Sequence, residues 1–368
     1  MVFKKIDRYV GASFLMRLFG IALVLGLLYV IFDLLKKLDE IQEVGLANAV
    51  QTISSYYTCM LPIFLVDIVP ALVLVAAGLV LTSMARKREL LALKASGTSV
   101  YRVIAPIFFW TLIVNVAAFG FREVTGPDFA QRREVLNRVL DNEVEHDLLL
   151  RDEEFHRKLY VGQYSFPERT LKDICVVEDG GSNGNVGLQR VIQADFGSWN
   201  AAGELVLEDV EVRQMAQTPE GEGAAEPRVL PTFTLETHLT SFDFVEAAEE
   251  ESGSVTLMHT LPELRALIRR QPDIPLFRVL FHSRLASFFY PFVLLLVGVP
   301  WLVGFEHSVE SRFLSIIVGI LVAAGFYTLT FVFASMGKTL TLPPILAGWL
   351  PTITATAAGL WLFESMHT

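Results

Sequence analysis

Charged residues are scarce in this sequence, and cysteine is nearly absent. Asp, Glu, Lys and Arg make up only 19% of the 368 residues, whereas a typical soluble domain has about 25%. The two cysteines exclude a small protein held together by disulfides. The hydrophobic share of 52% excludes a largely disordered chain. Together with a mean hydropathy of +0.47, these values indicate that much of the chain is surrounded by lipid.

Sequence signatures of catalysis and of metal binding are also missing. The chain has no H-E-x-x-H and no C-x-x-C, and its seven histidines are scattered. Gly337-Lys338-Thr339 resembles the end of a phosphate-binding loop, but that motif requires a glycine five positions earlier, where Val332 stands. We therefore predict that the chain is not an enzyme and holds neither a cofactor nor a metal.

Long apolar runs take the place of these motifs. A membrane-spanning helix needs about 20 consecutive apolar residues, and six runs are long enough. They predict six transmembrane helices over Leu18–Leu35, Tyr57–Met84, Val103–Phe121, Leu285–Phe305, Phe313–Met336 and Ile345–Phe363.

The net charge of −10 is unevenly distributed. Arg122–Ser283 contains 30 acidic and 16 basic residues, whereas the rest of the chain contains 10 and 14. Such an acidic block argues against nucleic-acid binding, which needs a basic surface. The short loops predict the orientation, because basic residues gather on the cytoplasmic side. One side has ten (Lys4, Lys5, Arg8, Arg17, Arg86, Lys87, Arg88, Lys94, Arg102 and Arg312) and the other three (Lys36, Lys37 and Lys338). Both termini should therefore be cytoplasmic, and residues 122–283 periplasmic.

The acidic block has the pattern of β structure. Short runs that are rich in β-branched and aromatic residues predict strands, and two polar helices should flank them. The expected fold class is a membrane protein of six α-helices, three before and three after a β-sandwich or jelly-roll domain, with boundaries at 1–121, 122–283 and 284–368. The predicted strands are Lys158–Tyr164, Leu171–Glu178, Leu188–Ala194, Glu204–Met215 and one or two in Val229–Phe244; the helices are Asp128–Glu145 and Leu261–Arg270, and Thr218–Pro227 should be a mobile loop.

The first residues allow two interpretations. Phe3, Ile6, Val10 and Phe14 recur at helical spacing among basic residues, which is typical of an amphipathic helix on the cytoplasmic leaflet. The same pattern fits a simple N-terminal extension of the first span.

A short segment between the second and third spans, residues 85–97, combines helix formers with charge. Strong helix formers run from Ala85 to Ala95, and Gly97 is placed to end the helix. Leu90, Leu93 and Lys94 share one face, with Glu89 at its edge. The segment is either an ordinary basic loop or a helix that docks into a groove on a cytoplasmic partner.

At this point the sequence resembles the LptF/LptG permease family, the membrane subunits of the bacterial lipopolysaccharide exporter. The likeness spans the whole chain, because several motifs agree in order and spacing while the β region agrees by placement only. The N-terminal motif favours LptG over LptF. The motifs are Ile6-Asp7-Arg8-Tyr9-Val10-Gly11, Phe32-Asp33-Leu34-Leu35-Lys36-Lys37, Ile68-Val69-Pro70-Ala71-Leu72, Arg88-Glu89-Leu90, Lys94-Ala95-Ser96-Gly97 and Leu342–Pro351.

The resemblance implies partners and a mechanism. A paralogous permease would pair with this chain, a cytoplasmic LptB-like ATPase dimer would hydrolyse ATP, and an LptC-like bridge protein would join on the periplasmic side. Lipopolysaccharide would enter from the inner membrane between gates formed by the first and fifth helices and be passed to a bridge of jelly-roll domains. The residues implied in ATPase coupling are Arg88, Glu89, Leu90, Leu93, Lys94 and Gly97.

The implied lipid site lies on the first and fifth helices. Lys36 and Lys37 would meet headgroup phosphates, with Asp33 orienting one of them, or would only anchor the helix at the interface. Leu27, Ile31 and Phe326 would receive acyl chains. Val30 departs from the family, since some relatives have a further lysine there.

Two other classes of protein remain open from the sequence. The first is a membrane receptor or sensor whose periplasmic β domain binds a ligand. The second is the permease of another ABC exporter, although an FtsX-like subunit would normally have four spans.

Overall fold

A computed structural model describes residues 5–37, 46–141, 143–152, 155, 157–179, 188–200, 204–218, 221–224, 227–240, 243–245, 247–248, 260–270, 272, 274–304 and 312–364. The chain forms two compact units. The helical unit comprises Met1–Phe32, Leu61–Pro127 and His259–Thr368, and the sheet unit comprises Asp33–Met60 and Asp128–Met258.

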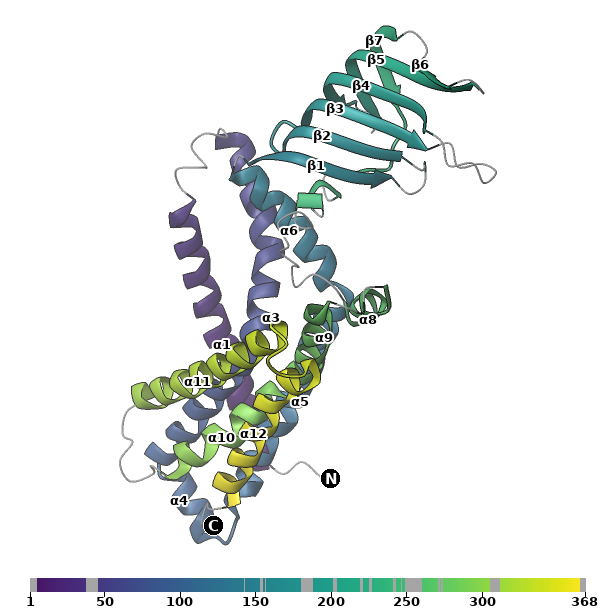
Figure 1. The fold of residues 1–368 in the computed structure, drawn as a ribbon. Helices are drawn as coiled ribbons and strands as arrows, with labels where there is room; N and C mark the ends of the chain where they lie inside the picture. The colour runs from purple at the N-terminus through teal and green to yellow at the C-terminus, as the bar shows by residue number, and fades with distance from the viewer. Residues whose placement is uncertain are drawn as a thin grey trace. The chain divides into compact units, whose positions relative to one another are not determined.

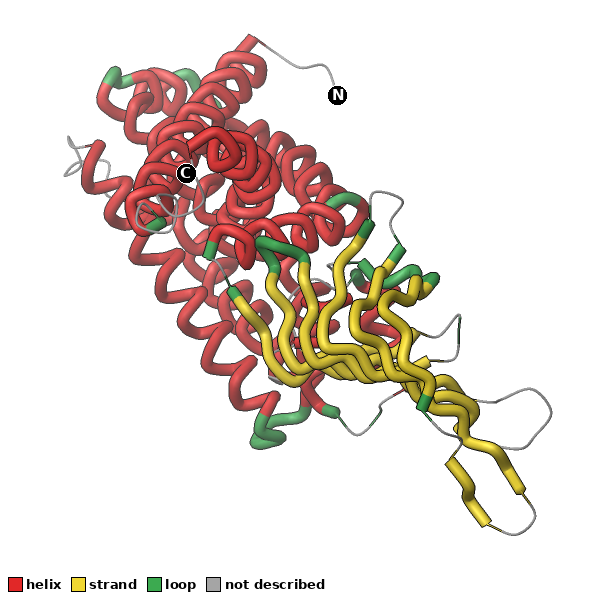
Figure 2. Tube along the Cα trace, turned by 90° about the horizontal axis from the view of Figure 1, so that it is seen from above, coloured by secondary structure: helices red, strands yellow, loops and turns green. Residues whose placement is uncertain are grey.

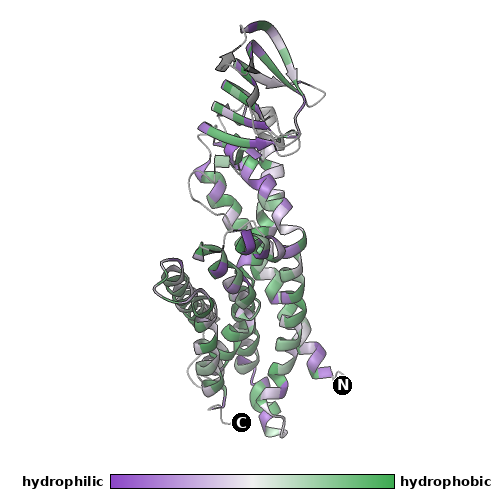
Figure 3. Ribbon diagram, turned by 45° about the vertical axis from the view of Figure 1, so that its right-hand side comes forward, coloured by the Kyte–Doolittle hydropathy of each residue, from purple (hydrophilic) through white to green (hydrophobic). Residues whose placement is uncertain are grey.

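Long apolar helices make up most of the helical unit (Figure 1). Figure 3 shows that hydrophobic residues predominate along them. The helices are α1 (Lys5–Lys36), α3 (Leu46–Arg86), α4 (Glu89–Ala95), α5 (Val100–Val124), α8 (Leu261–Arg270), α9 (Pro275–Ser287), α10 (Tyr290–Gly304), α11 (Arg312–Lys338) and α12 (Pro344–Glu364), of which α1 and α3 continue into the sheet unit.

Five of the described helices, α1, α3, α5, α11 and α12, are long and apolar enough to cross a membrane. A sixth crossing results if α9 and α10, which meet at a bend of 53°, form one broken span. On that condition the fourth span begins at Pro275 and not, as predicted, at Leu285. The bend has a local cause, because Pro291 stands in the first turn of α10 and a proline there cannot continue the preceding helix. Asn115 of α5 donates its side-chain N–H to the Phe288 carbonyl at 2.8 Å and so satisfies a backbone group at the break.

The N-terminal residues are part of the first long helix. From Lys5 to Lys36, α1 is one uninterrupted helix of 32 residues, as the second interpretation of this region predicted. Val10, Phe14 and Leu18, spaced four apart, are buried on one face in a core shared with residues of α3, α5 and α10. Gly11 allows close packing there, because a Cβ atom at this position would lie 2.3 Å from the indole nitrogen of Trp110.

The sheet unit is built on one antiparallel sheet of seven strands, seen as a single layer in Figure 2. Strands β1 to β6 follow one another in sequence order, and β7 pairs with β5 beside β6. Helix α6 (Gly126–Leu140) leads into β1. The strands are β1 (Val144–Asp152), β2 (Arg157–Ser165), β3 (Thr170–Asp179), β4 (Leu188–Trp199), β5 (Leu205–Thr218), β6 (Gly221–Ala224) and β7 (Arg228–Leu235).

One face of the sheet carries the core of this unit. Alternate residues such as Leu159 and Val161 on β2 are buried, and Tyr164 stacks on Phe244 with ring centroids 4.0 Å apart. The predicted strands β2 to β5 and β7 are confirmed, whereas two expectations were wrong. Residues 144–145 belong to β1 and not to a helix, and the loop expected at Thr218–Pro227 contains β6. The described strands form one sheet, and the two-sheet jelly roll stays a prediction.

Candidate functional site

The segment expected to couple to an ATPase is a sharp corner between two helices. Instead of a single helix from Ala85, α3 runs on to Arg86, and α4 begins at Glu89. Between them Arg88 has a φ of 59°, in the left-handed region that a side chain disfavours. The Arg88 N–H donates to the Ala85 carbonyl at 2.9 Å, and Ala92 N–H donates to the Arg88 carbonyl. Arg88 thus sets the angle at which α4 leaves α3.

Gly97 ends α4, as the sequence predicted. Its φ of 79° suits glycine, and its N–H donates to the Lys94 carbonyl at 2.9 Å. The next residue, Thr98, donates its N–H to the Leu93 carbonyl at 3.0 Å. These two bonds make up a Schellman motif and satisfy carbonyls that the short helix would otherwise leave free.

The two apolar sides of α4 have different roles. Leu90 is 3% exposed because it packs into the core of the helical unit, and Leu93 packs partly against that core. Lys94 is half-buried. Leu91, which the sequence reasoning did not single out, is 60% exposed. Successive residues of a helix point in different directions, so a leucine directly after the buried Leu90 could have been predicted to face away from the core.

Glu89 is the acidic group at this corner. Both of its carboxylate oxygens lie within hydrogen-bond distance of the Tyr9 hydroxyl, at 3.3 and 3.2 Å. Lys87 lies 3.8 Å from one of them, with its own side chain 60% exposed. Tyr9 stands 80 residues earlier in the chain, so no local pattern indicates this contact.

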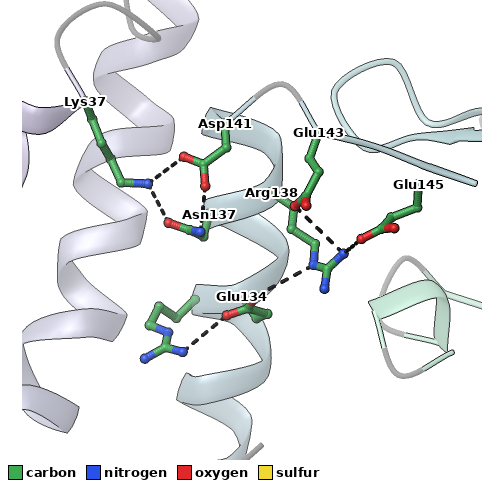
Figure 4. A network of polar contacts seen from close by, with 8 residues as sticks. Lys37, Glu134, Asn137, Arg138, Asp141, Glu143 and Glu145 are labelled. Carbon is green, nitrogen blue, oxygen red and sulfur yellow. Dashed lines mark hydrogen bonds and ion pairs between the residues drawn. The ribbon is translucent and has the colours of Figure 1, made fainter. Parts of the chain in front are cut away.

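The end of α1 carries the predicted headgroup lysines, which differ in their surroundings; Figure 4 shows those of Lys37. Lys37 donates its ammonium to Asp141 at 2.9 Å and also to the Asn137 side chain, both at the end of α6. Its side chain is only 11% exposed, and it lies over the Tyr56 ring. Lys36, by contrast, is exposed.

Asp33 does not form the expected pair with a lysine among the described contacts. Its carboxylate accepts a hydrogen bond from the Tyr57 hydroxyl at 3.1 Å, and its backbone carbonyl accepts the Lys37 N–H. The Lys37 side chain points toward α6 instead, because Asp141 and Asn137 offer its ammonium two acceptors there.

A second polar group lies on α6 beside the first (Figure 4). The guanidinium of Arg138 is paired with Glu145 of β1 and lies 3.6 Å from Glu134 and 3.8 Å from Glu143. Burial raises the pKa of the Glu143 carboxyl above its ordinary value, and the nearby Arg138 opposes this effect. This cluster ties α6 to the first strand of the sheet.

The three residues implied in acyl-chain contact differ in exposure. Leu27 and Ile31 are exposed on α1. Phe326 on α11 is buried, with its ring centroid 4.9 Å from that of Tyr290.

Two ion pairs in the helical unit were not anticipated. Arg284 of α9 is 7% exposed and donates to the Glu123 carboxylate of α5 at 2.8 Å, and Glu123 also accepts the Leu261 N–H at the start of α8. Arg122 lies 3.7 Å from Asp67 of α3, both being partly exposed. Charges at such positions in apolar helices persist where they are paired.

The fold defines a class of protein, namely a multi-pass membrane protein with a β domain inserted between its helices. Residues 8–365 match the model of a family described as lipopolysaccharide export system permease LptF/LptG. The chain belongs to this family, and it is accordingly a multi-pass inner-membrane protein of lipopolysaccharide export, a permease and not itself an enzyme. A comparison with curated proteins finds no match.

Proposed function

We propose that the chain is the permease subunit of an ATP-driven lipopolysaccharide exporter, in the LptG role that its N-terminal motif favours. A cytoplasmic LptB-like ATPase dimer would dock on the corner formed by α4, a paralogous permease would complete the lipid cavity, and an LptC-like protein would receive the lipid on a jelly-roll bridge. The observation that carries this proposal is the α4 corner, because it presents Glu89 and the exposed Leu91 on a rigidly held helix.

The proposed topology places both termini and α4 in the cytoplasm and residues 122–283 in the periplasm. It is based on the excess of lysine and arginine in the short loops on one side of the membrane. Two contacts within the helical unit support it. Tyr9 near the start of α1 meets Glu89 of α4, and Tyr101 in the first turn of α5 donates its hydroxyl to the Phe363 carbonyl near the end of α12 at 3.1 Å. The start of α1 and the end of α12 thus lie on the side of α4.

Labelling with a membrane-impermeant maleimide tests the topology. The substitutions are Ser96→Cys beside α4 and Ser198→Cys on β4, each in a Cys59→Ser and Cys175→Ser background. In intact spheroplasts we expect Ser198→Cys to react and Ser96→Cys to react only after lysis. Labelling of Ser96→Cys without lysis would contradict the proposed orientation.

The lipid is proposed to enter along α1 and α11. Leu27 and Ile31 offer an exposed apolar surface on α1, and Lys36 offers an exposed cation at its end. Photocrosslinkers at Ile31 and Lys36 should capture lipopolysaccharide, whereas a crosslinker at the buried Phe166 of the sheet unit should not. Failure at both α1 positions would argue against this route.

Purification in mild detergent tests the function as a whole. We expect an ATPase, a second permease and lipopolysaccharide to copurify with the chain. Glu89→Ala and Glu89→Arg should lower ATPase retention or uncouple hydrolysis from transport, because removing one member of a desolvated charge pair costs on the order of 2–5 kcal/mol. If both variants retain the ATPase and transport normally, the docking role of α4 is wrong.

A further inference from the structure

The Glu89 carboxylate is held in place by a residue from another helix. The Tyr9 hydroxyl lies 3.3 Å from one carboxylate oxygen and 3.2 Å from the other, so one donor faces both. The ammonium of Lys87 is 3.8 Å from the carboxylate and belongs to an exposed side chain. Exposed ion pairs of that kind contribute little free energy, because holding two long side chains in one geometry has an entropic cost. Tyr9 is therefore the contact that fixes the direction of the carboxylate.

Tyr9 itself stands on a rigid part of the molecule. Its neighbour Val10 is fully buried, as is Phe14 one turn later. Gly11 packs so closely against Trp110 of α5 that a Cβ atom would lie 2.3 Å from the indole nitrogen. A tyrosine side chain has only two rotatable χ angles, and its ring begins from a backbone that cannot shift toward α5. Tyr9 is itself 47% exposed, so its hydroxyl meets Glu89 at the surface while the backbone beneath it is held by buried neighbours.

The backbone of the corner is held by contacts on both sides of Glu89. Leu90 anchors α4 in the same core that buries Val10 and Phe14. Arg88 holds the left-handed turn before Glu89, and Gly97 closes the helix after it. The long side chain of Glu89 has rotational freedom of its own, and ordering such a side chain has an entropic cost when a partner binds.

We propose that Tyr9 is a positioning residue for ATPase docking. Its hydroxyl holds the Glu89 carboxylate in the conformation that a basic group of the ATPase meets, so that the carboxylate is ordered before the partner arrives. This inference rests on the proposed docking role of Glu89. It adds that the start of α1, and not α4 alone, sets the affinity of the permease for its ATPase.

The test uses the full exporter complex in lipid nanodiscs and measures both the dissociation constant of the ATPase and the rate of ATP hydrolysis. Tyr9→Phe removes only the hydroxyl. We expect it to weaken ATPase binding by about three- to tenfold, the range for one long side chain that must be ordered when the partner binds. Tyr101→Phe is the matched control, because its hydroxyl donates to the Phe363 carbonyl in the same unit and not to Glu89. It should bind the ATPase like the parent.

A double-mutant cycle with Glu89→Ala separates positioning from a general effect on the fold. If Tyr9 acts through Glu89, Tyr9→Phe should change nothing further once Glu89 is alanine. Equal losses in both backgrounds, equal losses from Tyr101→Phe, or tighter binding by Tyr9→Phe would overturn the proposal.

The same cycle distinguishes two kinds of failure. If Glu89→Ala weakens binding but Tyr9→Phe does not, the positioning role is wrong and the docking function stands. If Glu89→Ala itself leaves binding unchanged, the docking function is wrong and the positioning role falls with it. Thermal unfolding of each variant confirms that it is folded before its binding is compared.

Discussion

Lys37 at the end of α1 and Asp141 at the end of α6 form an ion pair with 2.9 Å between ammonium and carboxylate, although 104 residues separate them. The amide of Asn137 accepts a second hydrogen bond from the same ammonium and donates one to Asp141. Because the lysine side chain is largely buried, this arrangement joins α1 to α6 within the sheet unit and leaves Lys36 as the exposed cation of the two.

Breaking the Lys37–Asp141 pair should destabilise the fold. Asp141→Ala leaves a largely buried ammonium with one acceptor fewer, which costs about 1–3 kcal/mol. We expect a lower melting temperature for the purified protein. Asp195→Ala removes an exposed carboxylate of β4 and should leave the melting temperature unchanged. Equal melting temperatures for both variants would show that the pair adds nothing.

The difference between the two lysines predicts unequal effects on lipid release. Lys36→Glu places a negative charge at an exposed position and should repel a phosphorylated headgroup, reducing ATP-dependent release several-fold. Lys37→Gln keeps a donor toward Asp141 and should have the smaller effect on release. Wild-type release by Lys36→Glu would indicate that Lys36 is only an interfacial anchor.

The exposed leucine of α4 should be essential for docking. Leu91→Asp puts a charge on an apolar contact, and loss of a central interface residue commonly costs 2 kcal/mol or more, so ATPase retention should fall by about tenfold or more. Val229→Asp, at another exposed apolar position, on β7, should retain the ATPase. Retention by both variants would place the docking surface elsewhere.

Gly97→Ala should loosen α4 without any steric clash. An added Cβ meets nothing within 4 Å, but the φ of 79° strains an alanine by about 1–2 kcal/mol. Hydrogen exchange of the α4 amides should therefore speed up by about fivefold or more. Gly20→Ala serves as the control, because its Cβ also meets nothing and its backbone is helical. Unchanged exchange in α4 would mean that another residue ends this helix.

The thiol of Cys175 should react slowly at neutral pH. Burial raises its pKa above the ordinary value of 9.0, so less of the reactive thiolate is present at a given pH. In a Cys59→Ser background, alkylation by iodoacetamide should have a midpoint above pH 9 in the folded protein and return to about 9 in denaturant. Identical folded and unfolded profiles would show that the thiol is solvated.

Much of the fold could be predicted from local patterns. The bounds of α8 agree with those expected, and strands β2 to β5 were found because apolar and polar residues alternate along them. Strand β6 has the sequence Gly-Glu-Gly-Ala, which lacks the alternation of apolar and polar residues that predicts a strand. It is a strand only because it pairs with β5. The break after Ser287 was missed because hydropathy counts Pro291 within an apolar run and does not record direction.

In the candidate sites, local features could be predicted from the sequence and long-range contacts could not. Glycine at position 97 signalled the end of α4, since few other residues accept that backbone conformation. The partners of Glu89 and Lys37 could not be predicted, because they come from 80 and 104 residues away and tertiary packing alone brings them together.

The pairing of Glu123 with Arg284 can form only late in the synthesis of the chain. The two residues are 161 positions apart, and at about 5–20 residues per second a ribosome needs roughly 8–32 s to pass from one to the other. During that interval Glu123, near the end of an apolar helix, lacks its buried partner Arg284. The contact between α5 and α9 can therefore form only after the sheet-unit residues between them, 128–258, have been synthesised.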